Sequence, residues 1–406
     1  MVEFRTSGGT LIKVWVDNLE EIETLSQQQL HQMGGLPFIH QHIAVMPDVH
    51  LGKGAVIGSV VPAKDAVVPN IVGVDIGCGI SAYNTGVRRE QLNEEVDGEL
   101  QFWRTWEKAA LQEIPVGFNW FKKNQPWDGF NIDLRAKPIQ TYLEERARLQ
   151  LGTLGGGNHF VEAQTDENGR IWFMVHSGSR HTGYRIAEYY NRQAEELLAR
   201  SKTKYPTHLA YLSADNRLFD DYLHDMGWAV RFALENRWRM LERAVERFFD
   251  LFDSDRADDA ASVRTRGINI HHNFARIENH GGESVVVHRK GATSAQDGEI
   301  GIIPGSMATP SYIVKGRGNP DSFRSCSHGS GRVMSRTKAR KTIDQSDYEN
   351  ALAHTYTRPA RGYVDEAPQS YKNIHEVIQR QIDLIEPVHT LEPIITLKGD
   401  PRAADD

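Results

Sequence analysis

A long helical pattern between two β-rich parts is the feature that most constrains the fold of this 406-residue chain. Within residues 219–252 apolar side chains recur at spacings of three and four, which places them on one face of a helix. They are Leu223, Met226, Val230 and Ala233, followed by Leu241, Val245 and Phe248. Residues 43–86 and 263–335 consist of short β segments broken by glycine and proline. Because these parts flank the helical block instead of alternating with helices, the pattern predicts an α+β fold.

Shorter elements are predicted around these parts. Helices are expected at residues 88–114, 139–150, 185–200 and 372–384, a loop at 115–135, and short strands at 171–175 and at the IITL sequence near the C-terminus. Glycine–histidine motifs lie on both sides of the helical block, and no linker rich in proline or serine separates them. We therefore expect a single large domain with a β-rich core that carries a metal site, surrounded by helices and with a helical insertion at about 185–262.

Charge, cysteine count and hydropathy exclude several classes of protein. The net charge of −7 rules out a basic field over the whole molecule, although a local basic patch would still suffice to bind RNA. The two cysteines cannot form a disulfide framework. No run of about 18 apolar residues is present, and the N-terminal sequence does not resemble a signal peptide. We expect a cytoplasmic protein that does not span a membrane.

The sequence around Cys78 is the first of five motifs that combine glycine with metal-binding side chains. In GVDIGCG, Asp75 and Cys78 stand three residues apart, so a carboxylate and a thiolate leave one tight turn. Such a turn could hold a metal ion. A lone cysteine is more often buried and inert, so this motif alone favours that simpler interpretation.

Four histidine motifs follow along the chain. His159 ends the glycine-rich turn LGTLGGGNH, which lacks the lysine of a Walker loop. His176 ends an apolar strand and precedes SGSR. His271 and His272 are neighbours, so within a strand only one of them can face a given site. His328 precedes glycines and an arginine in SCSHGSGR, which suits a histidine exposed at a phosphate site.

The five motifs together indicate a metal site. One aspartate, one cysteine and three histidines form a mixed ligand set that suits Zn, Mn, Fe or Co better than Ca or Mg. Five ligands can hold two metal ions if one ligand bridges them, and two-metal sites typically handle phosphoryl chemistry. The residues alone therefore predict a metal-dependent phosphoryl-transfer enzyme.

Longer strings that contain these motifs closely resemble the RtcB family of RNA-splicing ligases. They are HIAVMPDVHLGKG (42–54), VGVDIGCG (72–79), LGTLGGGNHFVE (151–162), HSGSR (176–180), HHN (271–273), RKGATSA (289–295), IIPGSM (302–307) and SCSHGSGRVMSR (325–336). The resemblance implies a ligase domain over residues 1–399 that uses GTP and Mn²⁺. It would join RNA 3′-phosphate or 2′,3′-cyclic phosphate ends to 5′-hydroxyl ends, in tRNA splicing or RNA repair. Residues 400–406 extend beyond the Lys-Gly at which members commonly stop, and we expect a disordered tail there.

The resemblance assigns the metal ligands and the nucleophile position by position. Cys78 is implied to bridge two Mn²⁺ ions. His328 is implied to take GMP from GTP, and the histidine–GMP intermediate would pass GMP to RNA as an RNA–ppG end. The remaining ligands would be Asp75 and His272 on one ion, and His159 and His176 on the other.

The resemblance also implies a guanylate pocket and contacts with phosphate or RNA. The pocket residues would be Asn158, His159, Phe160, Val161, Glu162, His272, Asn273, Pro304, Gly305, Ser306, Met307, Ser311, His328, Gly329, Ser330, Gly331, Tyr371 and Lys398. The groups near the triphosphate or the RNA would be Asp48, His50, Arg180, Arg289, Lys290, Arg332 and Arg336. The implied partners are RNA with such ends, namely tRNA halves or damaged RNA, and an archease-like activator. The oligomeric state stays open.

Two other functions compete with this interpretation. A calcineurin-like metallophosphoesterase is excluded: its D-x-H and G-N-H motifs have counterparts here, but its G-D-x-x-D and G-H-x-H motifs do not. A non-catalytic RNA-binding descendant of a ligase is disfavoured because every ligand type and His328 are present. The same chemistry on cleaved tRNA, ribosomal RNA or DNA 3′-phosphate ends stays open.

Overall fold

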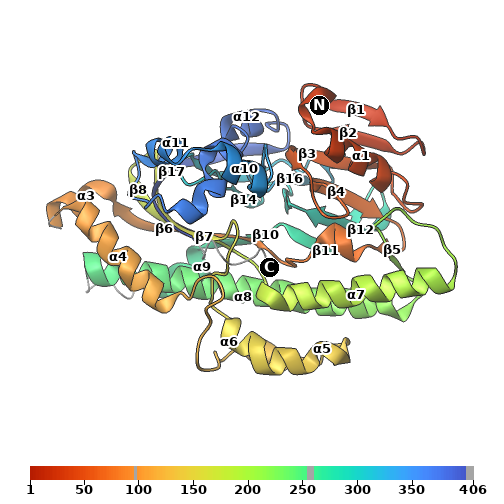
Figure 1. Cartoon of the computed structure of the whole chain (residues 1–406), viewed down its shortest axis with the longest axis horizontal. Helices are drawn as coiled ribbons and strands as arrows, with labels where there is room; N and C mark the ends of the chain where they lie inside the picture. The colour runs from red at the N-terminus through yellow and green to blue at the C-terminus, as the bar shows by residue number, and fades with distance from the viewer. Residues whose placement is uncertain (96–97, 254–259, 399–406) are drawn as a thin grey trace.

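The structure is a computed structural model that describes residues 1–95, 98–253 and 260–398 (Figure 1). The predicted tail at 400–406 lies outside the described residues. The fold is α+β, as the sequence pattern predicts. A β-rich core carries the motifs, and long helices lie along one side of it.

Two large sheets form the core. The first has six strands in the order β1 (Val2–Arg5), β2 (Leu11–Val14), β3 (His42–His50), β4 (Ile57–Ala63), β12 (Glu283–Lys290) and β11 (Asn273–His280). The second has seven antiparallel strands in the order β10 (Ile268–His271), β6 (Gly79–Arg88), β8 (Arg170–Ser177), β7 (Phe160–Asp166), β17 (Ile385–Lys398), β15 (Ser311–Gly316) and β14 (Ile300–Ile303). Two small pairs join β13 (Ala292–Ser294) to β16 (Ser325–Ser327) and β5 (Ala66–Val67) to β9 (Leu212–Ser213).

The helices lie around these sheets. They are α1 (Thr24–Met33), α2 (Pro69–Val72), α3 (Arg89–Glu95), α4 (Glu99–Glu113), α5 (Lys137–Tyr142), α6 (Arg148–Gln150), α7 (Arg180–Arg200), α8 (Arg217–Phe252), α9 (Val263–Arg266), α10 (Arg336–Thr342), α11 (Gln345–Leu352) and α12 (Ile374–Gln379). Short 3₁₀ or π turns occur at Leu19–Glu21, Asp128–Phe130, Leu143–Ala147, Pro320–Ser322, Arg361–Glu366 and Pro368–Ser370. Helices α7 and α8 run side by side below the sheets in Figure 1, and α5 and α6 lie beneath them.

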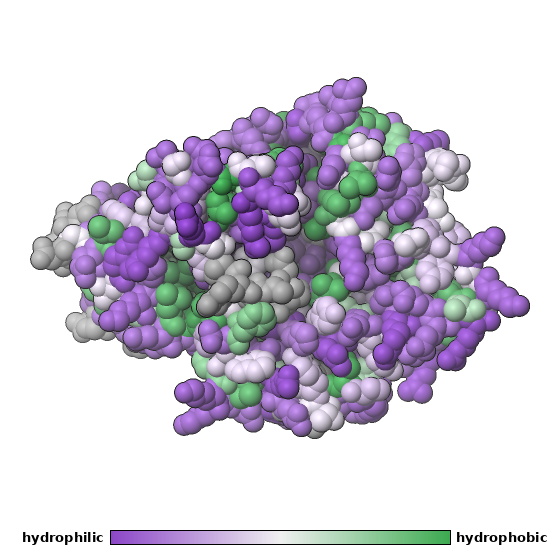
Figure 2. All heavy atoms as spheres, viewed as in Figure 1, coloured by the Kyte–Doolittle hydropathy of each residue, from purple (hydrophilic) through white to green (hydrophobic). Residues whose placement is uncertain are grey.

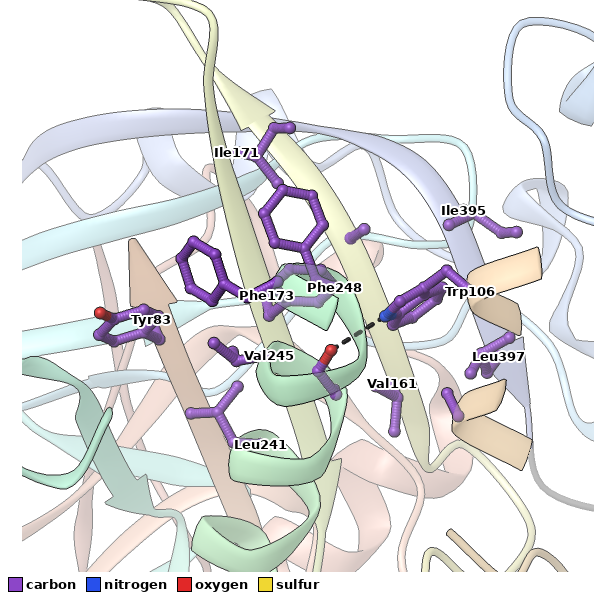
Figure 3. Packing of buried hydrophobic residues seen from close by; sticks show 14 of the residues in the cluster. Tyr83, Trp106, Val161, Ile171, Phe173, Leu241, Val245, Phe248, Ile395 and Leu397 are labelled. Atoms are coloured by element: carbon purple, nitrogen blue, oxygen red, sulfur yellow. Dashed lines mark hydrogen bonds between the residues drawn. The ribbon is translucent and has the colours of Figure 1, made fainter. Parts of the chain in front are cut away.

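Helix α8 confirms the helical pattern of the sequence and covers the second sheet. Its N-terminus is capped by Asn216, whose side chain accepts a hydrogen bond from the Leu218 N–H at 3.0 Å. Its apolar face packs Val245 and Phe248 against the sheet, as Figure 3 shows. The Trp106 indole of α4 donates a hydrogen bond to the Ala244 carbonyl at 2.9 Å (Figure 3). The helix is therefore fixed against the sheet by burial and by a directional bond.

Four of the predicted elements differ in extent from the observed ones. The predicted helix at 88–114 is two helices, α3 and α4, with Gly98 at φ 93° before the second. Helix α7 begins at Arg180, five residues before the predicted start. The predicted helix at 372–384 is wrong beyond α12, because the chain turns after Arg380 and enters β17. Strand β17 begins well before the predicted IITL strand, because it pairs with β15 as well as with β7.

The surface carries a recess near the centre of the face shown in Figure 2, between the segment that contains α10 and strands β3 and β4. Most of this face is hydrophilic, and hydrophobic residues appear on it in small separate groups. Among the helices of the described residues, none is long and apolar enough to cross a membrane.

Candidate active site

Strand pairing gathers four of the five predicted metal ligands, and the fifth, Asp75, stands three residues before Cys78. Cys78 directly precedes β6, which lies between β8 and β10 in the second sheet. Gly79 pairs with Ser177 on one side and with His271 on the other, so His176 and His272 reach Cys78 from the two neighbouring strands. His159 precedes β7, which is the next strand along the sheet.

The ligand atoms lie at distances that suit shared metal ions. The Cys78 Sγ is 3.3 Å from the His176 Nε2 and 3.5 Å from the His159 Nε2. The Asp75 Oδ2 is 3.2 Å from the His159 Nε2. Ligands bound about 2.0–2.3 Å from one ion lie roughly 3–4 Å apart, so these spacings fit. The donor set forms two groups, Cys78–His176–His272 and Asp75–Cys78–His159, and within each group the ligand atoms lie within 4.8 Å of one another.

This grouping differs from the partition that the resemblance implied. The expected partition placed Asp75 with His272, and His159 with His176. In the structure Asp75 contacts His159, while His176 and His272 approach Cys78 from adjacent strands. Sequence order cannot show this, because the register of β6 with its two neighbours decides which histidines meet. Cys78 belongs to both groups, as a bridging ligand would.

The electrostatics of the ligands favour a bound cation. Burial lowers the pKa of His176 and of His272 well below the usual range, so both imidazoles are neutral and can ligate. The His272 Nδ1 is buried and has no hydrogen-bond partner among the described residues. The His159 Nδ1 contacts the Leu154 carbonyl at 3.0 Å, which directs its Nε2 toward Cys78. The residues therefore fit one or two divalent transition-metal ions.

Two residues in the middle of α8 tie together the loops that carry the ligands. The Arg237 guanidinium is fully buried and donates to the Gly77 carbonyl, the Ser177 carbonyl and the Asn269 Oδ1, each at 2.8 Å. The Asn236 Oδ1 accepts from the Gly152 N–H at 2.6 Å and from the Thr153 N–H, and its amide donates to the Gly178 carbonyl. Neither residue was predicted from the sequence, since both look like ordinary polar positions of a helix.

His328 is held by a buried carboxylate. The Asp48 Oδ2 contacts the His328 Nδ1 at 2.6 Å and accepts from the His328 backbone N–H at 3.1 Å. A proton on Nδ1 leaves the lone pair on Nε2. Lys372 fixes the backbone on both sides of Asp48, because its ammonium donates to the Pro47 and Val49 carbonyls, both at 2.8 Å. Asp48 therefore supports His328, a role that was not predicted from the sequence.

Two cavities meet at His328. The larger one, here called the metal cavity, is lined by four of the five predicted metal ligands and by Lys53, Lys290 and Asn273; the fifth ligand, His176, lines the smaller cavity. The smaller one contains most of the predicted guanylate residues. They are Asn158, Phe160, Glu162, Pro304, Gly305, Ser306, Met307, Ser311, Gly329, Ser330, Gly331, Tyr371 and Lys398, joined by the unpredicted Glu366 and Thr396. His50, Asn158, His328, Arg332 and Arg336 line both cavities.

Buried charged side chains line part of the smaller cavity. Burial raises the pKa of Glu162 to about 7, although hydrogen bonds from Thr396 and Gln164 oppose the shift. Glu366 pairs with Lys398 at 2.8 Å and accepts from the Tyr371 hydroxyl at 2.7 Å. Burial alone would raise the pKa of Glu366, but Lys398 and two arginines lower it to about 2. No local pattern in the sequence signals Glu366.

The structure brings some of the other predicted residues to the site and not others. Val161 faces the hydrophobic core, because alternate residues of β7 point to opposite sides of the sheet. His159 and His272 line the metal cavity, not the smaller one. Arg289 is fully buried and pairs with Glu278 at 2.6 Å, away from both cavities. Its charge therefore stabilises β12 against β11.

Four basic residues lie at or beside the site. Burial lowers the pKa of Lys290 to about 7, and its ammonium donates to the Asn70 carbonyl at 2.9 Å. The buried Arg180 lies 3.5 Å from the His159 Nδ1. Arg332 and Arg336 reach both cavities but pair with Glu366.

Comparison with known proteins decides the family. A family model described as tRNA-splicing ligase RtcB matches residues 29–131 and 129–399. The chain belongs to the RtcB family. The RNA-splicing ligase RtcB of Escherichia coli (strain K12) is 39% identical over 421 residues, which cover 98% of this chain and 99% of that protein. The resemblance seen in the motifs is thereby confirmed.

More distant relatives carry similar names. The RNA-splicing ligase RtcB of Mycobacterium tuberculosis is 31% identical over 441 residues, covering 91% of this chain and all of that protein. The tRNA-splicing ligase RtcB of Nanoarchaeum equitans is 27% identical over 458 residues, covering 95% and 93%. The expectation that the chain is an enzyme of the RNA ligase class is confirmed by its family.

Proposed function

We propose that this chain uses GTP and Mn²⁺ to join RNA 3′-phosphate or 2′,3′-cyclic phosphate ends to RNA 5′-hydroxyl ends. The observation that carries the proposal is the position of His328. Its Nδ1 is held by Asp48 at 2.6 Å, and its ring lines both the metal cavity and the guanylate cavity. A nucleophile that takes GMP from a metal-bound triphosphate needs that position.

In the first step the His328 Nε2 attacks the α-phosphorus of GTP. An N–P bond forms, the bond between the α-phosphorus and the bridging oxygen breaks, and pyrophosphate leaves. Asp48 keeps the Nδ1 proton in place and stabilises the imidazolium that develops. Metal ions held by Cys78 and its neighbours would neutralise charge on the triphosphate and improve the leaving group.

The smaller cavity supplies a site for guanine. The two oxygens of the Glu162 carboxylate can accept hydrogen bonds from the two N–H groups on one edge of guanine. The Lys398 ammonium is a donor that suits the guanine oxygen. Adenine presents the opposite pattern on that edge, so this pair of residues favours GTP over ATP.

The later steps use the same two cavities. A cyclic end is first hydrolysed: water attacks the phosphorus, the bond to the 2′-oxygen breaks, and a 3′-phosphate results. An oxygen of this 3′-phosphate then attacks the phosphorus of His328–GMP. The N–P bond breaks and an RNA–ppG end forms. The 5′-hydroxyl oxygen then attacks the RNA 3′-phosphorus, a phosphodiester forms, and GMP leaves. Lys53 and Lys290 line the metal cavity, where the RNA phosphates would lie.

A joining assay tests the proposal. Two RNA strands, one ending in a 3′-phosphate and one beginning with a 5′-hydroxyl, are incubated with protein, Mn²⁺ and either GTP or ATP. A joined strand that requires GTP and is abolished by EDTA is expected. His328→Ala should abolish joining, while His354→Ala, which changes an exposed histidine outside both cavities, should not.

Other outcomes have definite meanings. Release of phosphate without GTP would identify a hydrolase and contradict the proposal. RNA binding without joining, in protein that carries metal, would indicate a binding module. Joining of DNA 3′-phosphate ends or of cleaved ribosomal RNA would leave the chemistry intact and change the substrate. An archease-like activator belongs to the same proposal, and its effect is measured as multiple turnover in this assay.

A further inference from the structure

The loop at residues 117–126, here called the aromatic loop, displays two large rings to solvent beside the metal cavity. Its sequence is GFNWFKKNQP. Phe118 is 66% exposed and Trp120 is 42% exposed, whereas the chain buries most of its other aromatic side chains. The loop lies between α4 and α6 in Figure 1. Exposed aromatic rings next to a catalytic cavity require an explanation other than packing.

The loop is attached directly to the wall of the metal cavity. The Gly117 N–H donates to the Gly155 carbonyl at 2.8 Å, and Val116 forms a β-bridge with Gly155. The next residue, Gly156, lines the metal cavity together with Asn158. A strand of RNA that leaves this cavity past Gly156 therefore meets the aromatic loop first.

The base of the loop is rigid, which keeps its tip in place. The Phe121 N–H donates to the Leu149 carbonyl at 3.0 Å, and the Gln125 N–H donates to the Arg148 carbonyl at 2.8 Å. The Arg243 guanidinium lies 4.7 Å from the Phe121 ring centroid and donates to the Gly152 carbonyl at 2.9 Å. Phe121 is thus held against the protein, while the rings of Phe118 and Trp120 are exposed to solvent.

The aromatic loop itself is basic, with two lysines and no acidic residue, although the whole chain carries −7. Lys122 and Lys123 follow Trp120 after one residue, Phe121, and are exposed. The exposed Arg146 guanidinium lies 6.0 Å from the Trp120 ring centroid. Within the described part of the chain, none of these three cations forms an ion pair with a carboxylate. Aromatic rings interleaved with unpaired cations are the pattern that binds single-stranded nucleic acid, through base stacking and phosphate contacts.

We propose that the aromatic loop is a docking platform for single-stranded RNA, where Phe118 and Trp120 stack on bases and Lys122, Lys123 and Arg146 contact the backbone. This inference rests on the proposed function for the identity of the RNA. It adds a binding surface that the two cavities do not include. Because every base has a flat face on which a ring can stack, the platform binds RNA independently of its sequence.

Two variants separate stacking from charge. The first is Phe118→Ser with Trp120→Ser, and the second is Lys122→Glu with Lys123→Glu. The matched controls are Leu25→Ser, an exposed apolar residue of α1, and Lys202→Glu with Lys204→Glu, two exposed lysines after α7. Binding of a fluorescent single-stranded RNA with a 3′-phosphate is measured by anisotropy on the metal-loaded full chain without GTP, so that no reaction occurs.

The stacking variant should weaken RNA binding by roughly 5- to 100-fold for each base lost from a ring. The charge variant should weaken it and flatten the dependence of affinity on salt. The controls should bind like the unaltered chain. Labelling of the protein with GMP in the absence of RNA should be unchanged in all four variants, because the loop lies outside both cavities.

The readouts distinguish failure of this inference from failure of the proposed function. If the unaltered chain takes no GMP, the proposed function fails, while the RNA affinities still test the platform. Unchanged RNA affinity in both loop variants, with folding verified by circular dichroism, would overturn the inference and indicate a protein partner for this surface. Photo-crosslinking of 4-thiouridine RNA to a peptide containing Trp120 would support it independently.

Discussion

Replacing Arg237 by methionine should weaken both the fold and the metal site. Arg237 is fully buried in the middle of α8, and its three hydrogen bonds hold the turn before Cys78, the residue after His176, and the strand that leads to His272. Methionine keeps the length and the helix propensity of the side chain but removes every donor. The variant therefore isolates the polar contacts.

The size of the effect follows from the contacts that are lost. Each buried acceptor left without a donor costs about 1–3 kcal/mol, and Arg237 donates to three of them. We expect a loss of about 3–5 kcal/mol in the free energy of unfolding of the metal-free protein. Loss of residues that orient metal ligands typically lowers metal affinity by about 10–100-fold, and we expect that range here.

Two assays check this prediction. Urea unfolding in EDTA gives the stability of the metal-free chain. Titration with Co²⁺, followed by the thiolate-to-cobalt absorption band of Cys78, gives the metal affinity without any measurement of activity. The control is Arg231→Met, the same change at an exposed position six residues earlier on α8. If Arg237→Met behaves like this control in both assays, the role given to Arg237 is refuted.

Three further predictions concern the site. Asp48→Asn should slow GMP transfer to the protein by about 10²–10⁴-fold with little change in GTP affinity, because the carboxylate orients His328; single-turnover labelling and equilibrium binding separate the two effects. GTP affinity should rise as the pH increases through about 7, since Glu162 must lose its proton to accept from guanine, and Glu162→Gln should remove this dependence. Chelation should lower the melting temperature, because Mn²⁺ at about 100 times its Kd stabilises the folded state by about 2.7 kcal/mol. The Cys78→Ser variant should have the same melting temperature with and without Mn²⁺. If Mn²⁺ raises the melting temperature of this variant as much as that of the unaltered chain, the metal site is contradicted.

The metal-binding and nucleophilic residues could be predicted from the sequence better than the residues that position them. The histidine and cysteine motifs could be found because glycines and strand ends mark them in the sequence. Glu366 could not be found, since its importance arises only when β17 brings Lys398 beside it. Arg289 lies within one of the motifs, but it forms an ion pair with Glu278 on the neighbouring strand and does not line the site. Pairings between distant segments depend on sheet register, which short patterns do not encode.

The same reasoning explains the long helix. Its apolar positions were visible at spacings of three and four, and α8 is observed over Arg217–Phe252. Asn236 and Arg237 were not distinguishable from solvent-facing polar residues, because α8 is buried on more than one side where it crosses the ligand loops. Helical periodicity identifies the face that packs on the sheet, but it does not identify polar residues buried in a network.

Covalent transfer of GMP to His328 tests the central claim most directly. The protein is incubated with Mn²⁺ and GTP labelled at the α-phosphate, separated on a denaturing gel, and digested so that the modified peptide can be identified by mass spectrometry. The account predicts an acid-labile, alkali-stable label that requires metal, is located on His328 and disappears in His328→Ala. Absence of label from fully metal-loaded protein, or a label on another residue, would contradict it.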